Sequence, residues 1–293
     1  MDLVVLGDCN PDLVLHGGDV EPQFGQAERV VERAELTIGG SAAIMACGAA
    51  RLGLRTALIS VAGDDAFGRF MLGELTARGV DVSGVVVDPT VTTSVSVVLV
   101  KGDDRATLTS LGSIGALSAA HVDRGLLHSA SHVHVSSFFL LHALRPDLPS
   151  LLREADATTS IDPNWDPSER WDATLPATDL LLLNEQEALR ITRLEDVEDA
   201  ARKLAREGTT VVVKLGAEGA LAIEGDRVVR SPGHTIHAVD AVGAGDSFDA
   251  GFIASSGRPL EERLAFANRC GALSMRAAGG TTAQPTLEEV MAG

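Results

Sequence analysis

The segment from Asp240 to Gly251 places small residues and a carboxylate directly before an apolar stretch that predicts a helix. At the start of that helix, Gly243, Ala244 and Gly245 would leave their backbone N–H groups uncovered, and aligned peptide dipoles there favour an anion such as phosphate. Asp246 follows directly, and a carboxylate beside an anion site is electrostatically unfavourable unless it has a chemical task. That task could be to accept a proton from a hydroxyl group whose oxygen attacks phosphorus. A glycine-rich turn with Asp246 as the helix N-cap is the simpler alternative.

This segment resembles the C-terminal signature of the ribokinase-like (PfkB) carbohydrate kinase family, and four earlier segments resemble further motifs in the family's order. They are Gly39-Gly40-Ser41-Ala42-Ala43 with Gly48 and Arg51-Leu52-Gly53, Gly63-Asp64-Asp65-Ala66-Phe67-Gly68, Asn184-Glu185-Gln186-Glu187, and Lys214-Leu215-Gly216-Ala217-Glu218-Gly219. The matches run from Gly7 to about Thr282, which is nearly the whole chain. The resemblance implies an α/β fold, a ribokinase-like three-layer α/β/α sandwich with a mainly parallel central sheet and a small β-sheet lid.

The resemblance also implies the chemistry of the site, with ATP as the phosphoryl donor. Asp246 would be the general base that deprotonates the acceptor hydroxyl group. Gly243, Ala244 and Gly245 would form the anion hole for the transferred phosphoryl group.

Two metal sites are implied in the same way. Asn184 and Glu187 would organise Mg²⁺ largely through waters, which suits an ion that keeps several waters and takes few protein ligands. The same two residues also fit a plain capping pair at a helix start. Asp240 and the Val242 carbonyl group match the place where many family members bind a monovalent cation, commonly K⁺.

The nucleotide-binding residues that the resemblance implies are Lys214, Gly216, Gly219, Gly243, Gly245 and Asn268. Gly216 and Gly219 would let the backbone approach the ATP phosphates and ribose, although a hairpin turn explains them equally well. Asn268 lies where the family's last helix passes the adenine.

The substrate-binding residues lie in the first half of the chain. Asp12 matches the family's acidic residue that binds substrate hydroxyl groups, together with Asn10, and a carboxylate can accept two hydroxyl hydrogen bonds at once. Gly39 and Gly40 would bring backbone N–H groups close to the substrate. Arg105 could reach a substrate hydroxyl or phosphate, and a solvated surface charge is the alternative.

Three features depart from the family pattern or stand outside it. Ile44 occupies a substrate-binding position where the family usually has Asn, so either the substrate lacks a group there or another residue replaces the amide. Asp166 follows Asp162-Pro163-Asn164-Trp165, where some sugar-acid kinases have Arg, which argues against a sugar acid. His132 and His134 would face the same side of a strand, but no third metal ligand is evident, so we expect buried positions.

Strands alternate with helices along most of the chain, which implies a parallel sheet covered on both faces. Two interruptions, at about 10–36 and 85–110, have β character, and we expect them to form one small sheet projecting from a single domain over 1–293. The predicted strands are 3–7, 56–61, 131–135, 159–161, 180–183, 210–215, 220–223 and 228–230 in the main sheet, and 13–16, 28–34, 94–101 and 105–110, with a turn at 102–104, in the lid. The predicted helices are 40–52, 66–77, 148–154, 185–191, 197–206, 243–255 and 260–277.

The 293 residues include 24 Lys and Arg against 41 Asp and Glu, a net charge of −17, and 45% are apolar. This balance argues against nucleic-acid binding, because neutralising phosphates needs clustered cations. No apolar stretch approaches the roughly 18 residues of a membrane helix, and no signal peptide is evident. Cys9, Cys47 and Cys270 show no disulfide pattern. We therefore expect a cytoplasmic protein that binds neither nucleic acid nor membrane.

The function we expect is ATP-dependent phosphorylation of a hydroxyl group on a small sugar. One alternative is a nucleoside kinase of the same family, but without Tyr and with only two Trp the chain offers a base few stacking partners, such as Phe24, Phe138 and Phe139. Another is a catalytically silent sugar-sensing homologue, which Ile44 suggests and the intact Asp246 opposes. Dinucleotide-binding and Walker-type glycine motifs are absent. Because an exposed apolar sheet face needs covering, we also expect a homodimer formed through the lid.

Overall fold

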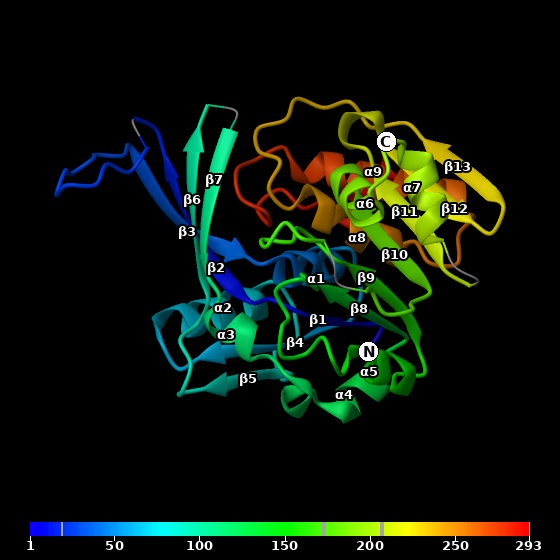
Figure 1. Ribbon diagram of the computed structural model, residues 1–293, viewed down its shortest axis with the longest axis horizontal. Coiled ribbons are helices and arrows are strands. Elements are labelled where there is room, and N and C mark those ends of the chain that lie inside the picture. Colours follow the sequence, from blue (N-terminus) through cyan, green and yellow to red (C-terminus); the bar gives the residue numbers. More distant parts are fainter. Residues whose placement is uncertain (19, 103, 172–173, 206–207, 293) are drawn as a thin grey trace.

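The computed structural model describes residues 1–18, 20–102, 104–171, 174–205 and 208–292. Its larger sheet has nine strands in the order β13-β12-β11-β10-β9-β8-β1-β4-β5 (Figure 1). The strands from β11 to β5 run parallel and β12 and β13 are antiparallel at one edge, so the predicted mainly parallel sheet is confirmed. The bounds are β1 (Leu3–Leu6), β4 (Thr56–Gly63), β5 (Val85–Asp88), β8 (His132–Ser136), β9 (Thr158–Asp162), β10 (Leu180–Asn184), β11 (Thr210–Lys214), β12 (Ala220–Glu224) and β13 (Arg227–Ser231).

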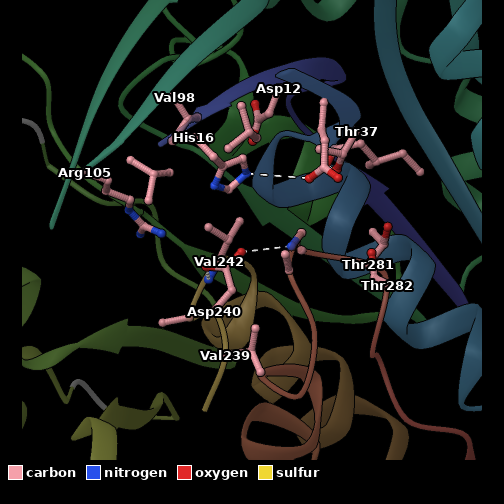
Figure 2. Close-up of a pocket in the computed structure, with 18 of the residues that line it drawn as sticks. Asp12, His16, Thr37, Val98, Arg105, Val239, Asp240, Val242, Thr281 and Thr282 are labelled. Atoms are coloured by element: carbon pink, nitrogen blue, oxygen red, sulfur yellow. Dashed lines mark hydrogen bonds and ion pairs between the residues drawn. The ribbon is translucent and has the colours of Figure 1, made fainter. Parts of the chain in front are cut away.

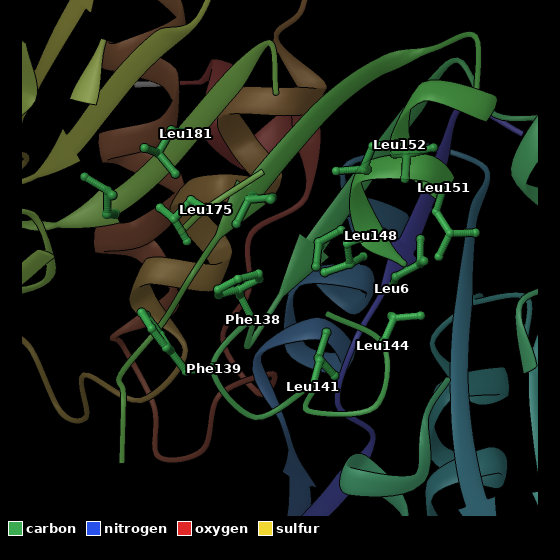
Figure 3. Close-up of a cluster of buried hydrophobic side chains, with 14 of the residues drawn as sticks. Leu6, Phe138, Phe139, Leu141, Leu144, Leu148, Leu151, Leu152, Leu175 and Leu181 are labelled. Atoms are coloured by element: carbon green, nitrogen blue, oxygen red, sulfur yellow. The ribbon is translucent and has the colours of Figure 1, made fainter. Parts of the chain in front are cut away.

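Helices cover both faces of this sheet. Successive side chains of a strand point to opposite faces, so Leu3 and Val5 of β1 join one apolar cluster while Val4 and Leu6 join another. The first cluster includes α1 (Ser41–Arg51), α2 (Ala66–Ala77), α8 (Ala244–Ala254), α9 (Leu260–Ser274) and α10 (Leu287–Met291). The second includes α3 (Gly112–Ala116), α4 (Arg124–His128), α5 (Leu148–Glu154), α6 (Glu185–Thr192) and α7 (Val197–Leu204). Figure 3 shows Leu6 beside the leucines of α5, and the three-layer sandwich is confirmed.

The smaller sheet stands apart from these layers and has four strands in the order β3-β2-β6-β7 (Figure 1). Its strands are β2 (Asn10–His16), β3 (Arg33–Gly39), β6 (Val95–Lys101) and β7 (Asp104–Ser110). Two predictions about it differ from the structure. The predicted strand 28–34 instead covers 33–39, and β5 at 85–88 pairs with β4 in the main sheet. The predicted turn residue Asp103 and the predicted helix end Arg206 lie outside the described residues.

The register of this sheet, which we call the lid, gives it two different faces. One face carries the cross-strand rows Thr37-Asp12-Ser96-Thr109, Glu35-Val14-Val98-Thr107 and Arg33-His16-Val100-Arg105. The other carries Leu36-Leu13-Val97-Leu108 and Ala34-Leu15-Leu99-Ala106. The first face lines the cavities described below, so the lid presents polar groups to them and leaves an apolar face on its other side.

Other buried polar and sulfur groups agree with the sequence. His132 and His134 are buried and both contact the Ser160 hydroxyl, at 2.7 and 2.8 Å, and burial lowers their pKa values to about 4 and about 3. They are therefore neutral structural residues, as predicted. All three cysteines are free and buried. Among the described residues, no helix has the length and apolar character needed to cross a bilayer.

Candidate active site

A cavity of about 280 Å³ lies between the lid and the N-terminal ends of α1 and α8. The predicted site residues that line it are Asn10, Asp12, Gly40, Ile44, Arg105, Val242, Gly243 and Asp246. The structure therefore brings the predicted substrate-binding residues from the N-terminal half and the predicted base from the C-terminal segment into one place.

Asp12 is held at the start of β2 by its neighbours. The Asn10 side-chain amide donates to Asp12 Oδ1 at 3.2 Å and to the Ser96 hydroxyl at 3.3 Å. Gly39 lies directly beneath this carboxyl group, because a Cβ there would be 1.9 Å from Asp12 Oδ1. Gly40 has φ +80°, and a Cβ there would be 2.8 Å from Asn10 Oδ1. Gly39 and Gly40 are thus needed for close packing under the two side chains.

Asp8 is a buried carboxylate that the sequence did not single out. It accepts hydrogen bonds from the backbone N–H groups of Ser41 at 3.1 Å and Ala42 at 2.8 Å, and so caps α1 from the end of β1. Burial raises the pKa of Asp8. Burial also raises the pKa of Asp12 to about 7, with the charge of Asp8 adding to the rise and the charge of Arg105 opposing it.

The N-terminus of α8 begins at a left-handed turn. Gly243 is the N-cap with φ +72°, and a Cβ there would lie 2.8 Å from the Gly280 backbone and 2.9 Å from Ile44 Cγ2. The following residues, Ala244 and Gly245, begin the helix, so their N–H groups lack partners within it, and the Ala244 N–H donates instead to the Ala241 carbonyl oxygen at 3.3 Å. Ile44 is buried, and its methyl groups pack against Gly243 and Gly280. At this position the apolar side chain therefore supports the turn that precedes α8.

Asp246 lies in the first turn of α8 and is buried against the cavity. Burial raises its pKa from 3.8 to about 8, and the negative charge of Asp162 adds to the rise. The charge of Lys214 and a hydrogen bond from Ser41 act in the opposite direction. A carboxyl group with a pKa near neutral pH is suited to accepting and releasing a proton.

Lys214, at the end of β11, belongs to a buried ionic network. Its ammonium group lies 2.6 Å from Asp162 Oδ2 and 3.1 Å from both oxygens of Asp249. A Cβ on Gly245 would lie 3.5 Å from Lys214 Nζ, so this positive charge is next to the N-terminus of α8. Lys214 was predicted to bind the nucleotide, and in this structure two carboxyl groups already hold it. Neither Asp162 nor Asp249 was predicted from the sequence to belong to the site.

Charges in this network shift one another's pKa values. Burial alone would lower the pKa of Lys214, but Asp162 and Asp249 outweigh burial and raise it. Burial would raise the pKa of Asp162, but the charge of Lys214 together with several hydrogen bonds outweighs burial and lowers it, whereas burial keeps the pKa of Asp249 high. The geometry and these directions describe a charged Lys214–Asp162 pair beside Asp249, whose carboxyl group binds a proton more readily than that of Asp162.

Asn184 and Glu187 form a complete capping box at the start of α6. The Glu187 N–H donates to Asn184 Oδ1 at 2.9 Å, and the Asn184 N–H and amide donate to Glu187 at 2.9 and 2.6 Å. The capping interpretation is confirmed. Burial, with the charge of Asp162, raises the pKa of Glu187 to about 7. Because Asn184 and Glu187 already hydrogen-bond to each other, they fit a Mg²⁺ ion that keeps its waters and is held through them. Among the described residues, no three His, Cys, Asp or Glu side chains group so that they could hold a metal ion directly.

Two other residues predicted to bind the nucleotide, Gly219 and Asn268, lie beside the 231–233 backbone. Gly219 has φ +100°, and a Cβ there would meet the Ser231 carbonyl oxygen at 2.1 Å. The Asn268 amide donates to the carbonyl oxygens of Ser231 at 3.2 Å and Pro232 at 3.1 Å. Gly216 begins a short 3₁₀ turn, η2 (Gly216–Glu218). None of these residues lines the cavity that holds Asp12 and Asp246.

Asp240 borders a second, larger cleft of about 1070 Å³ that continues along the polar face of the lid. Figure 2 shows Asp240 and Val242 across this cleft from Asp12, His16 and Arg105. Asp240 accepts hydrogen bonds from the N–H groups of Val242 at 3.0 Å and Gly279 at 2.9 Å. Its carboxylate therefore ties the segment before α8 to the loop after α9.

Comparison with known proteins agrees with this geometry. The model of the family described as "pfkB family carbohydrate kinase" matches residues 1–287. An ATP-dependent ribose-1-phosphate kinase of Halopiger xanaduensis is 32% identical over 296 residues, with 98% of this chain and 95% of the relative covered. The crystal structure of a PfkB protein from Polaromonas sp. is 27% identical with a TM-score of 0.81, and both chains are covered completely. A ribokinase of Arabidopsis thaliana, solved with ribose and ATP, has the same fold (23% identity, TM-score 0.83, 99% and 97% covered).

Proposed function

Because the chain belongs to the pfkB family of carbohydrate kinases, we propose that it transfers the terminal phosphoryl group of ATP to a hydroxyl group of a small sugar. The observation that carries this proposal is the position of Asp246. Its carboxyl group shares one cavity with Asp12 and Gly243, in the first turn of α8, where the backbone N–H groups lack partners within the helix.

The proposed mechanism is an in-line transfer. The acceptor hydroxyl group gives its proton to Asp246 as its oxygen forms a bond to the γ-phosphorus of ATP. The bond from phosphorus to the bridging oxygen breaks, and ADP leaves with that electron pair. The N–H groups of Gly243, Ala244 and Gly245 stabilise the charge on the transferred group, because they are fixed before the reaction begins.

The acidic surroundings of Asp246 support a cation requirement. Asn184 and Glu187 would hold Mg²⁺ through its waters, and when bound this ion neutralises charge on the phosphates. We propose Lys214, Gly216, Gly219 and Asn268 as the nucleotide side, with Lys214 acting from its ionic network. A K⁺ ion near Asp240 and the Val242 carbonyl group would stabilise the same turn.

Asn10, Asp12 and Arg105 support a polyol acceptor. An amide and a carboxylate beside each other can both donate to and accept from hydroxyl groups. Arg105 adds a positive charge at the junction of the cavity and the cleft. Since the relative from Halopiger xanaduensis is named for ribose 1-phosphate, sugar phosphates belong among the acceptors to be tested.

The test is an ATP-consumption assay with Mg²⁺, with and without K⁺, over pentoses, hexoses, ketoses, sugar phosphates, sugar acids and nucleosides. The expected result is turnover of at least one sugar by the natural protein and turnover lowered roughly 10³-fold in the Asp246→Asn variant. Near-normal turnover in the variant, or no turnover with any sugar, would contradict the proposal. Preferential turnover of a nucleoside would support the nucleoside kinase instead.

We also propose a homodimer formed through the apolar face of the lid. Leu108 is 62% exposed in the row Leu36-Leu13-Val97-Leu108, and covering such a row gains free energy from the hydrophobic effect. Leu108→Asp should therefore halve the mass measured by light scattering after size-exclusion chromatography. Val87→Asp, on β5 and also exposed, is the control and should leave the mass unchanged. A natural protein that is monomeric at micromolar concentration would contradict this.

A further inference from the structure

The loop after β9 presents an indole ring to the candidate active site. Trp165 lines the same cavity as Asp12 and Asp246 and is 42% exposed. The stacking partners suggested by the sequence do not serve there, because Phe138 and Phe139 are buried and Phe24 lies outside the cavity lining. Among the described residues that line this cavity, Trp165 is the one aromatic side chain.

The residues before Trp165 are fixed by a short hydrogen-bonded chain. The Asn164 N–H donates to Asp162 Oδ1 at 3.0 Å, and the Ser137 N–H donates to Asn164 Oδ1 at 2.6 Å. Ser137 and Asn164 both line the cavity, and both have a left-handed backbone, with φ +58° and +54°. The position of Trp165 is therefore determined from the ends of β8 and β9.

The residues after Trp165 place a second indole ring, that of Trp171, against it. The buried carboxylate of Asp166 accepts hydrogen bonds from the Trp171 N–H at 2.8 Å and from the Ser168 N–H at 2.9 Å. This turn brings the Trp171 ring edge-to-face against Trp165, with centroids 5.0 Å apart and an interplanar angle of 87°. Trp171 packs in the same way on the buried Phe139, at 5.3 Å. Trp165 is thus the exposed end of a stack of aromatic rings whose other members are buried.

The backbone around this stack is strained. Seven non-glycine residues described here have positive φ, and four of them, Ser137, Asn164, Glu169 and Trp171, belong to the two loops that hold the indole. Left-handed non-glycine residues cost free energy and gather at ligand sites, where they fix side chains in advance. The structure also explains Asp166, whose carboxylate organises the turn and does not line the cavity.

We propose that Trp165 is the stacking surface for the ring of the acceptor. A substrate whose hydroxyl groups bind Asp12 and Asp246 would lay one flat face, made of sugar C–H groups or of an aromatic base, on the indole. Ser96, Thr107 and Thr109 of the lid line the same cavity and offer hydroxyl groups to the substrate. The proposal rests on the proposed kinase function, because it takes Asp12 and Asp246 as the acceptor side.

Trp165 can be tested by fluorescence, because the chain has two tryptophans and no tyrosine. Trp171→Phe leaves Trp165 as the reporter, and Trp165→Phe leaves Trp171. Each is titrated without ATP with D-ribose, D-fructose, ribose 1-phosphate, adenosine and adenine. We expect a saturable change in the first variant with the compound that the natural protein phosphorylates, and a much smaller change in the second. A response to adenine alone indicates a base on the indole, and a response to a sugar but not adenine indicates a sugar ring.

Steady-state kinetics provide a second test of the role of Trp165. Trp165→Ala should raise the KM for the acceptor roughly ten-fold, which corresponds to one aromatic contact, and leave kcat within about three-fold. Trp165→Phe should recover most of the loss, and Phe24→Ala is the control with an exposed aromatic residue outside the cavity. An unchanged KM in Trp165→Ala, or equal fluorescence responses in the two single-tryptophan variants, overturns the proposal while the kinase function stands.

The two failures remain distinguishable. If no compound is phosphorylated, the proposed function fails and the fluorescence titration alone decides whether Trp165 meets a ligand. A flat titration of the Trp165 reporter with every compound counts against the proposal in either case.

Discussion

Replacing Asp246 by Asn is expected to lower kcat by roughly 10³-fold and to change the KM of the sugar little. Asn has the shape of the carboxyl group but cannot take the proton of the acceptor hydroxyl group. The turn at Gly243 and the pair of Asn10 and Asp12 that we propose to bind the substrate stay intact, so binding should be retained. The measurement is steady-state kinetics with the sugar that the screen identifies. Asp64→Asn, an exposed carboxylate removed from the cavity, is the control and should be as active as the natural protein.

The pH dependence of the reaction tests the same residue in another way. Burial and the charge of Asp162 raise the pKa of Asp246 to about 8, and the base is active only when ionised. The kcat/KM of the natural protein should therefore rise with pH and level off above about 8. In Asp246→Asn this rise should be absent. A natural protein with flat kcat/KM between pH 6 and 9 would contradict the assignment of Asp246 as the base.

Stability should change in the opposite direction to activity. The pKa of Asp246 is near 3.8 in the unfolded chain and about 8 in the folded one. The contribution of the protonated Asp246 carboxyl group to the free energy of unfolding is therefore fully present below pH 3.8, and it is lost as the pH rises through 8. Because Asn does not titrate, Asp246→Asn should gain Tm relative to the natural protein as the pH rises toward 9, with the smallest difference near pH 4. A difference in Tm between the two proteins that stays constant from pH 4 to pH 9 would mean that folding does not raise the pKa of Asp246.

Elements with a regular apolar pattern could be predicted from the sequence, and irregular or short ones could not. The helices at 66–77 and 148–154 have the predicted bounds, because apolar residues recur at helical spacing in both. The five-residue helices α3, α4 and α10 were not predicted, since one turn and a half shows no periodicity. The prediction of 28–34 missed the bounds of β3 because only two of the seven residues of this strand, Ile38 and Gly39, are buried, so no buried alternation marks its register.

The candidate site likewise contains residues that could be predicted from the sequence and residues that could not. The turn at Gly243 consists of neighbouring residues, and so does the segment with Asn10 and Asp12. Each could therefore be recognised as a motif in the sequence. The network of Asp162, Lys214 and Asp249 joins residues far apart in the sequence, because Asp249 and Asp162 lie 35 and 52 positions from Lys214. Nothing in a single sequence shows that these three meet. The position of Trp165 likewise depends on Ser137, which lies 27 residues from its partner Asn164.

Lys214→Met is expected to lower the free energy of unfolding at pH 7.5 by about 3–5 kcal/mol, the typical cost of removing one partner of a buried ion pair. The side chains of Asp162 and Asp249 are almost fully buried, so neither can turn to water when the ammonium group is lost. Activity should fall as well, because Lys214 lies beside Gly245 and Asp249 follows Asp246 by one helical turn. The measurement is denaturant unfolding. The control is Lys203→Met, which removes an exposed lysine bonded to the Thr192 carbonyl oxygen and should cost about 1 kcal/mol.

Two further measurements distinguish a loss of stability caused by the missing charge of Lys214 from one caused by lost packing. With Lys214 present, the pKa of Asp162 is lowered, so its contribution to stability exists above pH 3.8 and disappears as the pH falls. Without Lys214, burial raises that pKa, and the variant should be least impaired at low pH. The difference in stability should thus be smaller at pH 4.5 than at pH 7.5. The double variant Asp162→Asn with Lys214→Met, which removes both charges and keeps an acceptor for the Asn164 N–H, should regain part of the loss. A loss that is independent of pH and not recovered in the double variant would mean that Lys214 acts by its volume and not by its charge.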